Sequence, residues 1–154
     1  MKNVFFLARS RISLALATSI LLVGWHPANA NVGEITVFKD PNCGCCGKWA
    51  QHMRANGFKV DEIPTRKMGE VKRQSGMPGS LGSCHTAKIG GYIVEGHVPA
   101  ADVMRLLRER PTVTGISAPG MPAGSPGMEG PFPASRYEVV SFDAKGGVEI
   151  FARH

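Results

Sequence analysis

The chain has 154 residues, 43% of them hydrophobic, and a formal net charge of +6 at pH 7. This hydrophobic fraction is ordinary for a globular protein. No basic block interleaved with aromatic residues occurs in the sequence, which argues against a nucleic-acid-binding protein.

The first 30 residues have the pattern of a secretory signal peptide. Three basic residues lie within the first eleven positions, an apolar run covers residues 12–23, and Ala28-Asn29-Ala30 has the small-x-small pattern of a cleavage site. The apolar run is too short for a typical membrane span. We expect cleavage after Ala30 and a periplasmic mature chain, residues 31–154, with a net charge of +3 and no membrane span. A retained membrane anchor is the alternative.

The mature chain is predicted to begin with a βαβ unit. Residues 34–38 are β-branched and aromatic and precede a break, which is typical of a buried strand. Residues 48–57 have helical spacing of apolar residues and end in a glycine, and residues 58–63 alternate apolar and polar side chains. Three cysteines between positions 43 and 46 are therefore expected in the first turn of a helix that follows a strand.

The other elements are predicted from shorter patterns. We expect a short helix within residues 66–75 and a β-hairpin around Gly90-Gly91. Residues 99–108 begin with proline and have apolar residues at helical spacing, which predicts an amphipathic helix. Residues 111–133 are rich in Pro, Gly and Ser and are predicted to form a long loop. Residues 134–154 are expected to form a closing β-hairpin.

The cysteine cluster is the strongest chemical feature of the sequence. Cys43 and Cys46 have C-x-x-C spacing at a helix N-terminus, where free backbone N–H groups and the helix dipole favour the thiolate. Such thiolates react, bind soft metals or form disulfides. Two structural disulfides are the usual outcome for four cysteines in an exported protein. However, adjacent residues such as Cys45 and Cys46 are only about 3.8 Å apart at Cα, shorter than the about 5.5 Å of a relaxed disulfide.

The order of strand, C-x-x-C, helix and later hairpin resembles the thioredoxin fold, an α/β architecture with a mixed central sheet and flanking helices. Its motif is often Cys-Gly-Pro-Cys, and here Cys45 takes the place of the proline. The resemblance implies that Cys84, and with it His85, faces the cysteine turn. A site of four thiolates and one divalent ion would have a net charge of minus two. Several sulfur-bridged Cu(I) ions would neutralise the four thiolates. Charge balance therefore favours a Cu(I)–thiolate cluster over a single zinc ion.

Several sequence blocks together resemble the periplasmic CopG-type copper-resistance family. They are Asp40-Pro41-x-Cys43-Gly44-Cys45-Cys46, Ser83-Cys84-His85-Thr86, Val94-Glu95-Gly96-His97-Val98-Pro99, and the Pro-Gly-Met segments 119–122 and 124–129. The resemblance implies a thioredoxin-like fold and a copper–thiolate site formed by Cys43, Cys45, Cys46 and Cys84. It also implies a role in copper homeostasis, with periplasmic copper chaperones or exporters as partners. Redox cycling of the bound copper would make the protein a copper-dependent oxidoreductase.

Four further residues are candidates for metal ligands or for neighbours of ligands: His85, His97, Met121 and Met128. The alternatives are a solvated loop residue for His85, a structural hydrogen bond for His97, and gap filling in the loop for the two methionines. His52 and His154 are expected to be solvated, and Trp49 to lie in the core or over the cysteine turn.

Two other functions stay open at the level of sequence. A thiol–disulfide oxidoreductase would use the C-x-x-C pair without metal, although Cys45 could attack a Cys43–Cys46 disulfide. A structural zinc or iron–sulfur module would also use clustered cysteines.

Overall fold

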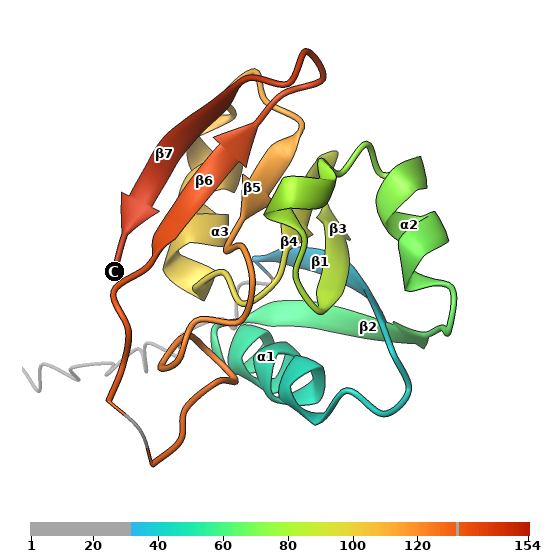
Figure 1. Ribbon diagram of the computed structural model, residues 1–154, viewed down its shortest axis with the longest axis vertical. Coiled ribbons are helices and arrows are strands. Elements are labelled where there is room, and N and C mark those ends of the chain that lie inside the picture. The colour runs from blue at the N-terminus through green and yellow to red at the C-terminus, as the bar shows by residue number, and fades with distance from the viewer. Residues whose placement is uncertain (1–31, 132) are drawn as a thin grey trace, which may run out of the picture.

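The computed structural model describes residues 32–131 and 133–154, which form a mixed α/β structure (Figure 1). The predicted signal peptide and its cleavage site lie outside the described residues. In chain order the elements are β1 (Gly33–Lys39), α1 (Gly44–Ala55), β2 (Phe58–Pro64), α2 (Met68–Gln74), the 3-10 helix η1 (Gly79–Leu81), β3 (His85–Ile89), β4 (Tyr92–Glu95), α3 (Ala100–Glu109), β5 (Gly115–Ser117), β6 (Glu138–Phe142) and β7 (Val148–Arg153).

The described strands form one seven-stranded sheet with the order β2-β1-β3-β4-β5-β6-β7. The pairs β1–β2 and β4–β5 are parallel, and the other neighbouring pairs are antiparallel. The β3–β4 hairpin turns at Gly90 and Gly91. Their φ angles of 55° and 90° are rarely adopted by residues other than glycine. The sheet is therefore a nearly sequential series of strands, with β1 inserted between β2 and β3.

The predicted βαβ unit is confirmed by β1, α1 and β2. Ile35 and Val37 of β1 are buried, and α1 places Trp49 and Met53, both fully buried, in the same hydrophobic cluster. The helix begins at Gly44 with Cys43 as its N-cap residue. The three clustered cysteines consequently lie at the start of α1, where the sequence predicts them.

Helices α1 and α3 contribute to one core on one face of the sheet. Val103 and Leu106 of α3 join Trp49 and Met53 in the main cluster. Helix α3 begins one residue later than predicted, because Pro99 is its N-cap residue. A second cluster contains Met77, Ile93 and Phe142. Since Ile93 and its neighbour Val94 belong to different clusters and successive strand residues point to opposite faces, the two clusters lie on opposite faces of the sheet.

The segment predicted as one long loop, residues 111–133, contains a strand. Strand β5 has only three residues, all buried, and pairs with β4 on one side and β6 on the other. A side chain at Gly115 would place its Cβ 2.1 Å from the Ile93 carbonyl oxygen, so glycine permits the close approach to β4. The prediction was incomplete because a three-residue strand is too short to show a periodic pattern in a segment rich in Pro, Gly and Ser.

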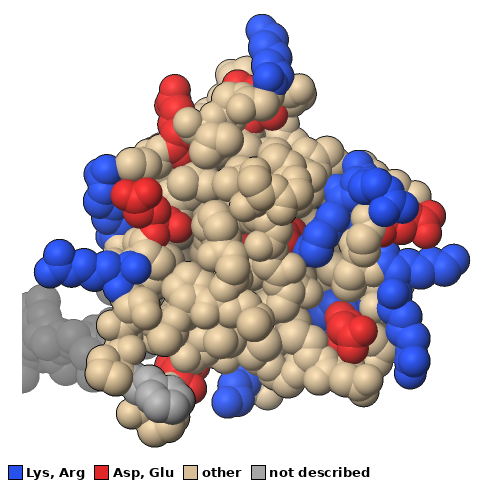
Figure 2. Space-filling model, in the orientation of Figure 1, with Lys and Arg blue, Asp and Glu red and all other residues tan. Residues whose placement is uncertain are grey.

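The face of the molecule shown in Figure 2 carries Lys, Arg, Asp and Glu mainly around its periphery, while its middle is largely uncharged. Neither sign of charge forms a continuous surface there. None of the helices in the described part of the chain is long and apolar enough to cross a membrane.

Candidate metal centre

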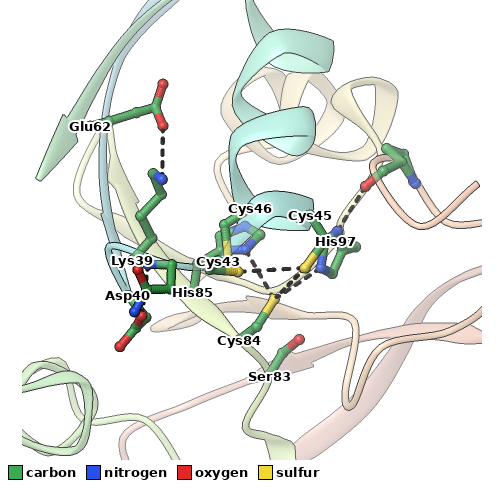
Figure 3. Close-up of a disulfide and its surroundings, with 12 residues drawn as sticks. Lys39, Asp40, Cys43, Cys45, Cys46, Glu62, Ser83, Cys84, His85 and His97 are labelled. Carbon is green, nitrogen blue, oxygen red and sulfur yellow. Dashed lines mark hydrogen bonds and ion pairs between the residues drawn. A yellow bond between two sulfur atoms is a disulfide. The ribbon is translucent and has the colours of Figure 1, made fainter. Parts of the chain in front are cut away.

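The sulfur atoms of the four cysteines lie within 4.8 Å of one another (Figure 3). Cys43 and Cys46 are joined by a disulfide, and Cys45 and Cys84 are free thiols. The Cys45 sulfur lies 3.5 Å from that of Cys43 and 4.0 Å from that of Cys84. The structure thus brings Cys84, 38 positions after Cys46 in the sequence, to the cysteine turn.

The cysteine turn is shaped by the residues between β1 and α1. The Asp40 carboxylate accepts a hydrogen bond from the Asn42 backbone N–H, and the Asp40 carbonyl accepts one from the Cys43 N–H. These bonds form a tight turn of the kind that aspartate favours. Cys46 points inward and is fully buried, whereas Cys45 is partly exposed. The turn therefore anchors the cluster on one side and presents Cys45 toward Cys84 on the other.

Cys84 lies in the loop that leads into β3, and this loop is held by Glu95 of β4. The Glu95 side chain is fully buried. Its carboxylate accepts a 2.7 Å hydrogen bond from the Ser83 N–H and another of 2.7 Å from the Thr86 hydroxyl. Lys72 of α2 forms an ion pair with the same carboxylate. One carboxylate thus fixes the residues on both sides of Cys84 and His85.

Two buried histidines extend the cysteine cluster. His97 Nε2 lies 2.9 Å from the Cys84 sulfur, and His85 Nδ1 lies 3.5 Å from it. The two rings meet edge to face at 5.1 Å, and the His85 ring also lies 4.4 Å from that of Trp49. Cys84, His85 and His97 form a second group whose ligand atoms lie within 4.8 Å of one another. The geometry therefore offers both sulfur and imidazole nitrogen to a metal ion.

Burial sets the protonation of this group. Burial, followed by the charge of Cys45 and a hydrogen bond with it, raises the pKa of the Cys84 thiol to about 12. Burial also lowers the pKa of His97, and it lowers the pKa of His85 well below its usual value with help from His97 and Lys72. At neutral pH the metal-free site therefore holds a Cys84 thiol beside neutral imidazoles. His85 Nε2 is buried and has no hydrogen-bond partner within the described residues.

The methionine-containing loop reaches the site at His97. The Pro126 carbonyl lies 2.8 Å from His97 Nδ1. Met128 is partly buried and its backbone bonds within the loop, whereas Met121 is 55% exposed. A copper-binding role for Met121 and Met128 stays a prediction.

The prediction that His52 is solvated was wrong, because this residue is half-buried, whereas His154 is exposed as predicted. His52 Nε2 accepts a 3.1 Å hydrogen bond from the Ala100 N–H at the start of α3. His154 Nε2 lies 2.8 Å from Asp102 Oδ2, and its ring stacks on Tyr137 at 5.0 Å. The spacing of His52 from Cys46 indicated that His52 points away from the cysteine turn. It could not indicate that the start of α3 packs against His52.

Glu95 and Lys72 are site residues that the sequence reasoning did not identify. A signal for Glu95 was present, because this acidic residue directly follows the apolar run Tyr92-Ile93-Val94. An ionisable residue in a buried strand requires polar partners. No comparable signal marks Lys72, whose partner comes from a distant strand.

The chain is similar to proteins of known structure along most of its length. Residues 81–128 match a family model described as a protein of unknown function, DUF411. Two solved structures titled copper resistance protein CopG, form 2 and form 1, are each 48% identical to this chain and cover 79% of it. The matches span 98% and 96% of those chains, with TM-scores of 0.76 and 0.75. No curated protein sequence gives a significant match. With this identity over nearly the full length of the solved proteins, the chain belongs to the CopG copper-resistance family.

Proposed function

We propose that this protein binds copper as Cu(I) through the thiolates of Cys43, Cys45, Cys46 and Cys84 and acts in periplasmic copper resistance. The observation that carries the proposal is the convergence of four sulfur atoms within 4.8 Å. Thiolates are soft ligands, and soft ligands select Cu(I). The names of the two similar structures point to the same metal. Periplasmic copper chaperones or exporters are the proposed partners.

The arrangement of the first four strands supports a thioredoxin-like architecture as part of this proposal. Strand β1 lies between the parallel β2 and the antiparallel β3, and β3 pairs with β4. The C-x-x-C pair lies at the N-terminus of the helix that follows β1. In this proposal Cys45 supplies a third sulfur ligand at the position where thioredoxins often have proline.

Copper loading requires reduction of the Cys43–Cys46 disulfide. A dithiol donor would supply two electrons and two protons, become a disulfide itself and leave four cysteine thiols. Cu(I) would then displace thiol protons, because only the thiolate is a strong ligand. Several Cu(I) ions are expected, because they balance the charge of four thiolates. His97 and His85 would add nitrogen ligands from the buried side.

An anaerobic Cu(I) titration of the reduced mature chain against a competing chelator tests this proposal. We expect more than one copper per chain, and a clear loss of stoichiometry or affinity in Cys45→Ser. The matched control is the same chain with the Cys43–Cys46 disulfide retained, which should bind less copper. Fewer than one copper per reduced chain, or unchanged binding in Cys45→Ser, would refute the proposal.

Redox cycling of the bound copper is the finer part of the proposal. Sulfur ligands favour Cu(I), whereas imidazole also suits Cu(II), so a mixed site can serve both states. Electron paramagnetic resonance of the loaded protein should show a Cu(II) signal that disappears on reduction and returns on oxidation. A loaded protein that never shows this signal under oxidant is a storage or transfer protein.

A thiol–disulfide oxidoreductase is the second candidate function. It is favoured by the Cys43–Cys46 disulfide at a helix N-terminus. The Cys45 sulfur, 3.5 Å from that of Cys43, is the feature against it, because this thiol could attack the disulfide. The metal-free protein would then reduce a disulfide substrate catalytically, and Cys45→Ser would keep that rate. If the metal-free protein does not reduce the disulfide substrate, this candidate is excluded.

A further inference from the structure

The loop of residues 122–129, here called the site loop, contacts the candidate metal centre at His97. The Pro126 carbonyl oxygen lies 2.8 Å from His97 Nδ1. We propose that the site loop positions His97 as a copper ligand through this carbonyl, and that Gly127 is the residue that lets the loop come close enough. The inference rests on the proposed function in that it takes His97 as a ligand.

The Pro126 contact determines which nitrogen of His97 carries the proton. A carbonyl oxygen can only accept a hydrogen bond, so Nδ1 must be the donor. The other ring nitrogen, Nε2, faces the Cys84 sulfur at 2.9 Å, and with the proton on Nδ1 it is the atom that can offer a lone pair to a metal ion. Metal-binding histidines commonly donate their second ring N–H to a carbonyl or carboxylate, which fixes the tautomer and the ring orientation.

The site loop has the internal bonds needed to hold this carbonyl in place. Ser125 is fully buried, and both its N–H and its hydroxyl donate to the Pro122 carbonyl. The Met128 N–H donates to the Ser125 carbonyl, and the Gly124 N–H donates to that of Met128. Pro126 therefore lies in a compact turn whose shape is fixed by its own backbone.

Gly127 determines how closely this turn lies against α1. Its φ angle is +86°, and a Cβ atom at this position would lie 2.7 Å from the Cys45 carbonyl oxygen and 2.8 Å from the Trp49 backbone nitrogen. Both are backbone atoms of α1, which cannot move aside cheaply. Any side chain at position 127 would therefore push the loop, and Pro126 with it, away from the helix and from His97.

A nearby glycine gives a matched control. Gly130 follows one residue after the site loop, and a Cβ atom there would meet no atom within 4 Å. Its φ angle is not in the positive range that disfavours side chains. Gly130→Ala should therefore leave the Pro126–His97 contact intact, whereas Gly127→Ala should break it.

The first test is long-range ¹⁵N NMR of the histidine rings in the reduced, metal-free protein. We expect wild-type His97 to carry its proton on Nδ1, and Gly127→Ala to lose this fixed tautomer while Gly130→Ala keeps it. This measurement needs no copper. The tautomer of wild-type His97 can be determined without any variant. A wild-type His97 with its proton on Nε2 would overturn the inference, even if Gly127→Ala failed to fold.

The second test is Cu(I) affinity, measured by chelator competition in Gly127→Ala, His97→Asn and the double variant. Gly127→Ala should weaken copper binding about 10- to 100-fold, as loss of such an outer partner typically does. In the His97→Asn background it should cause little further loss, because the loop acts through His97. An equal loss in both backgrounds would overturn the inference. If the wild type binds no copper, the proposed function fails, and the NMR result still decides the tautomer.

Discussion

Glu95 is the residue on which the geometry around Cys84 most depends. Its buried carboxylate accepts bonds from Ser83 and Thr86 and pairs with Lys72, whose side chain is only 21% exposed. Removing one partner of a buried pair leaves the other charge without compensation. This residue therefore connects the stability of the sheet with the placement of one proposed copper ligand.

We predict that Glu95→Ala lowers the free energy of unfolding by about 3 kcal/mol or more, within the range for breaking a buried ion pair. The control is Glu34→Ala, which removes the exposed pair with Lys59, whose side chain is 66% exposed. Such surface pairs contribute about 0–1 kcal/mol. Urea unfolding of both variants at pH 7 measures the difference. Equal stability of the two variants would show that the Glu95 network contributes no more than a surface pair.

Helix α1 holds the start of α3 at two points next to His97. Trp49 Nε1 donates a 2.8 Å hydrogen bond to the Val98 carbonyl, and His52 Nε2 accepts one from the Ala100 N–H. The N-cap residue of α3, Pro99, forms no side-chain capping bond. His52 therefore supplies from another helix the acceptor that the first N–H groups of α3 need.

The His52 contact should make stability depend on pH. Burial lowers the pKa of His52 in the folded state, so the unfolded chain binds more protons in acid. Its contribution is therefore present above the ordinary histidine pKa of about 6.5 and is lost as pH falls through the lower folded value. We predict that His52→Ala is less stable than wild type at pH 7, and that the gap narrows at pH 5. Thermal unfolding at both values measures this, and a gap that widens in acid would contradict it.

The elements show what the sequence could and could not predict. Residues 34–63 carry their strand and helix patterns locally, so β1, α1 and β2 were predictable with the cysteines at the start of α1. Strand β5 was not, because its place depends on contacts with β4 and β6 rather than on its own three residues. The partners of His52 and Glu95 were missed for the same reason, since they come from segments distant in the chain.

At the scale of the whole molecule, the candidate metal centre joins parts of the chain that are far apart in sequence. Its residues come from the start of α1, the loop before β3, the segment after β4 and the site loop. A metal ion bound there would link these parts only in the folded state. Metal binding should therefore stabilise the entire fold.

We predict that Cu(I) raises the free energy of unfolding of the reduced protein by about 2.7 kcal/mol when free Cu(I) is 100 times the dissociation constant. Thermal unfolding under anaerobic conditions in a buffered Cu(I) series measures this shift. At the same free Cu(I) concentration, Cys84→Ser should gain less, because it lacks the sulfur that connects the hairpin to α1. A shift that is equal in Cys84→Ser would place the copper elsewhere.

The Cys43–Cys46 disulfide spans only three positions in the sequence. A crosslink over so short a loop restricts the unfolded chain little, and chain-entropy reasoning assigns it about 2 kcal/mol. We predict that the reduced protein keeps the fold of the oxidised one and loses no more than about this amount in urea unfolding. Global unfolding on reduction would contradict this. The disulfide can therefore open and close, exposing or protecting two sulfur atoms, while the hydrophobic core and the Glu95 network maintain the fold.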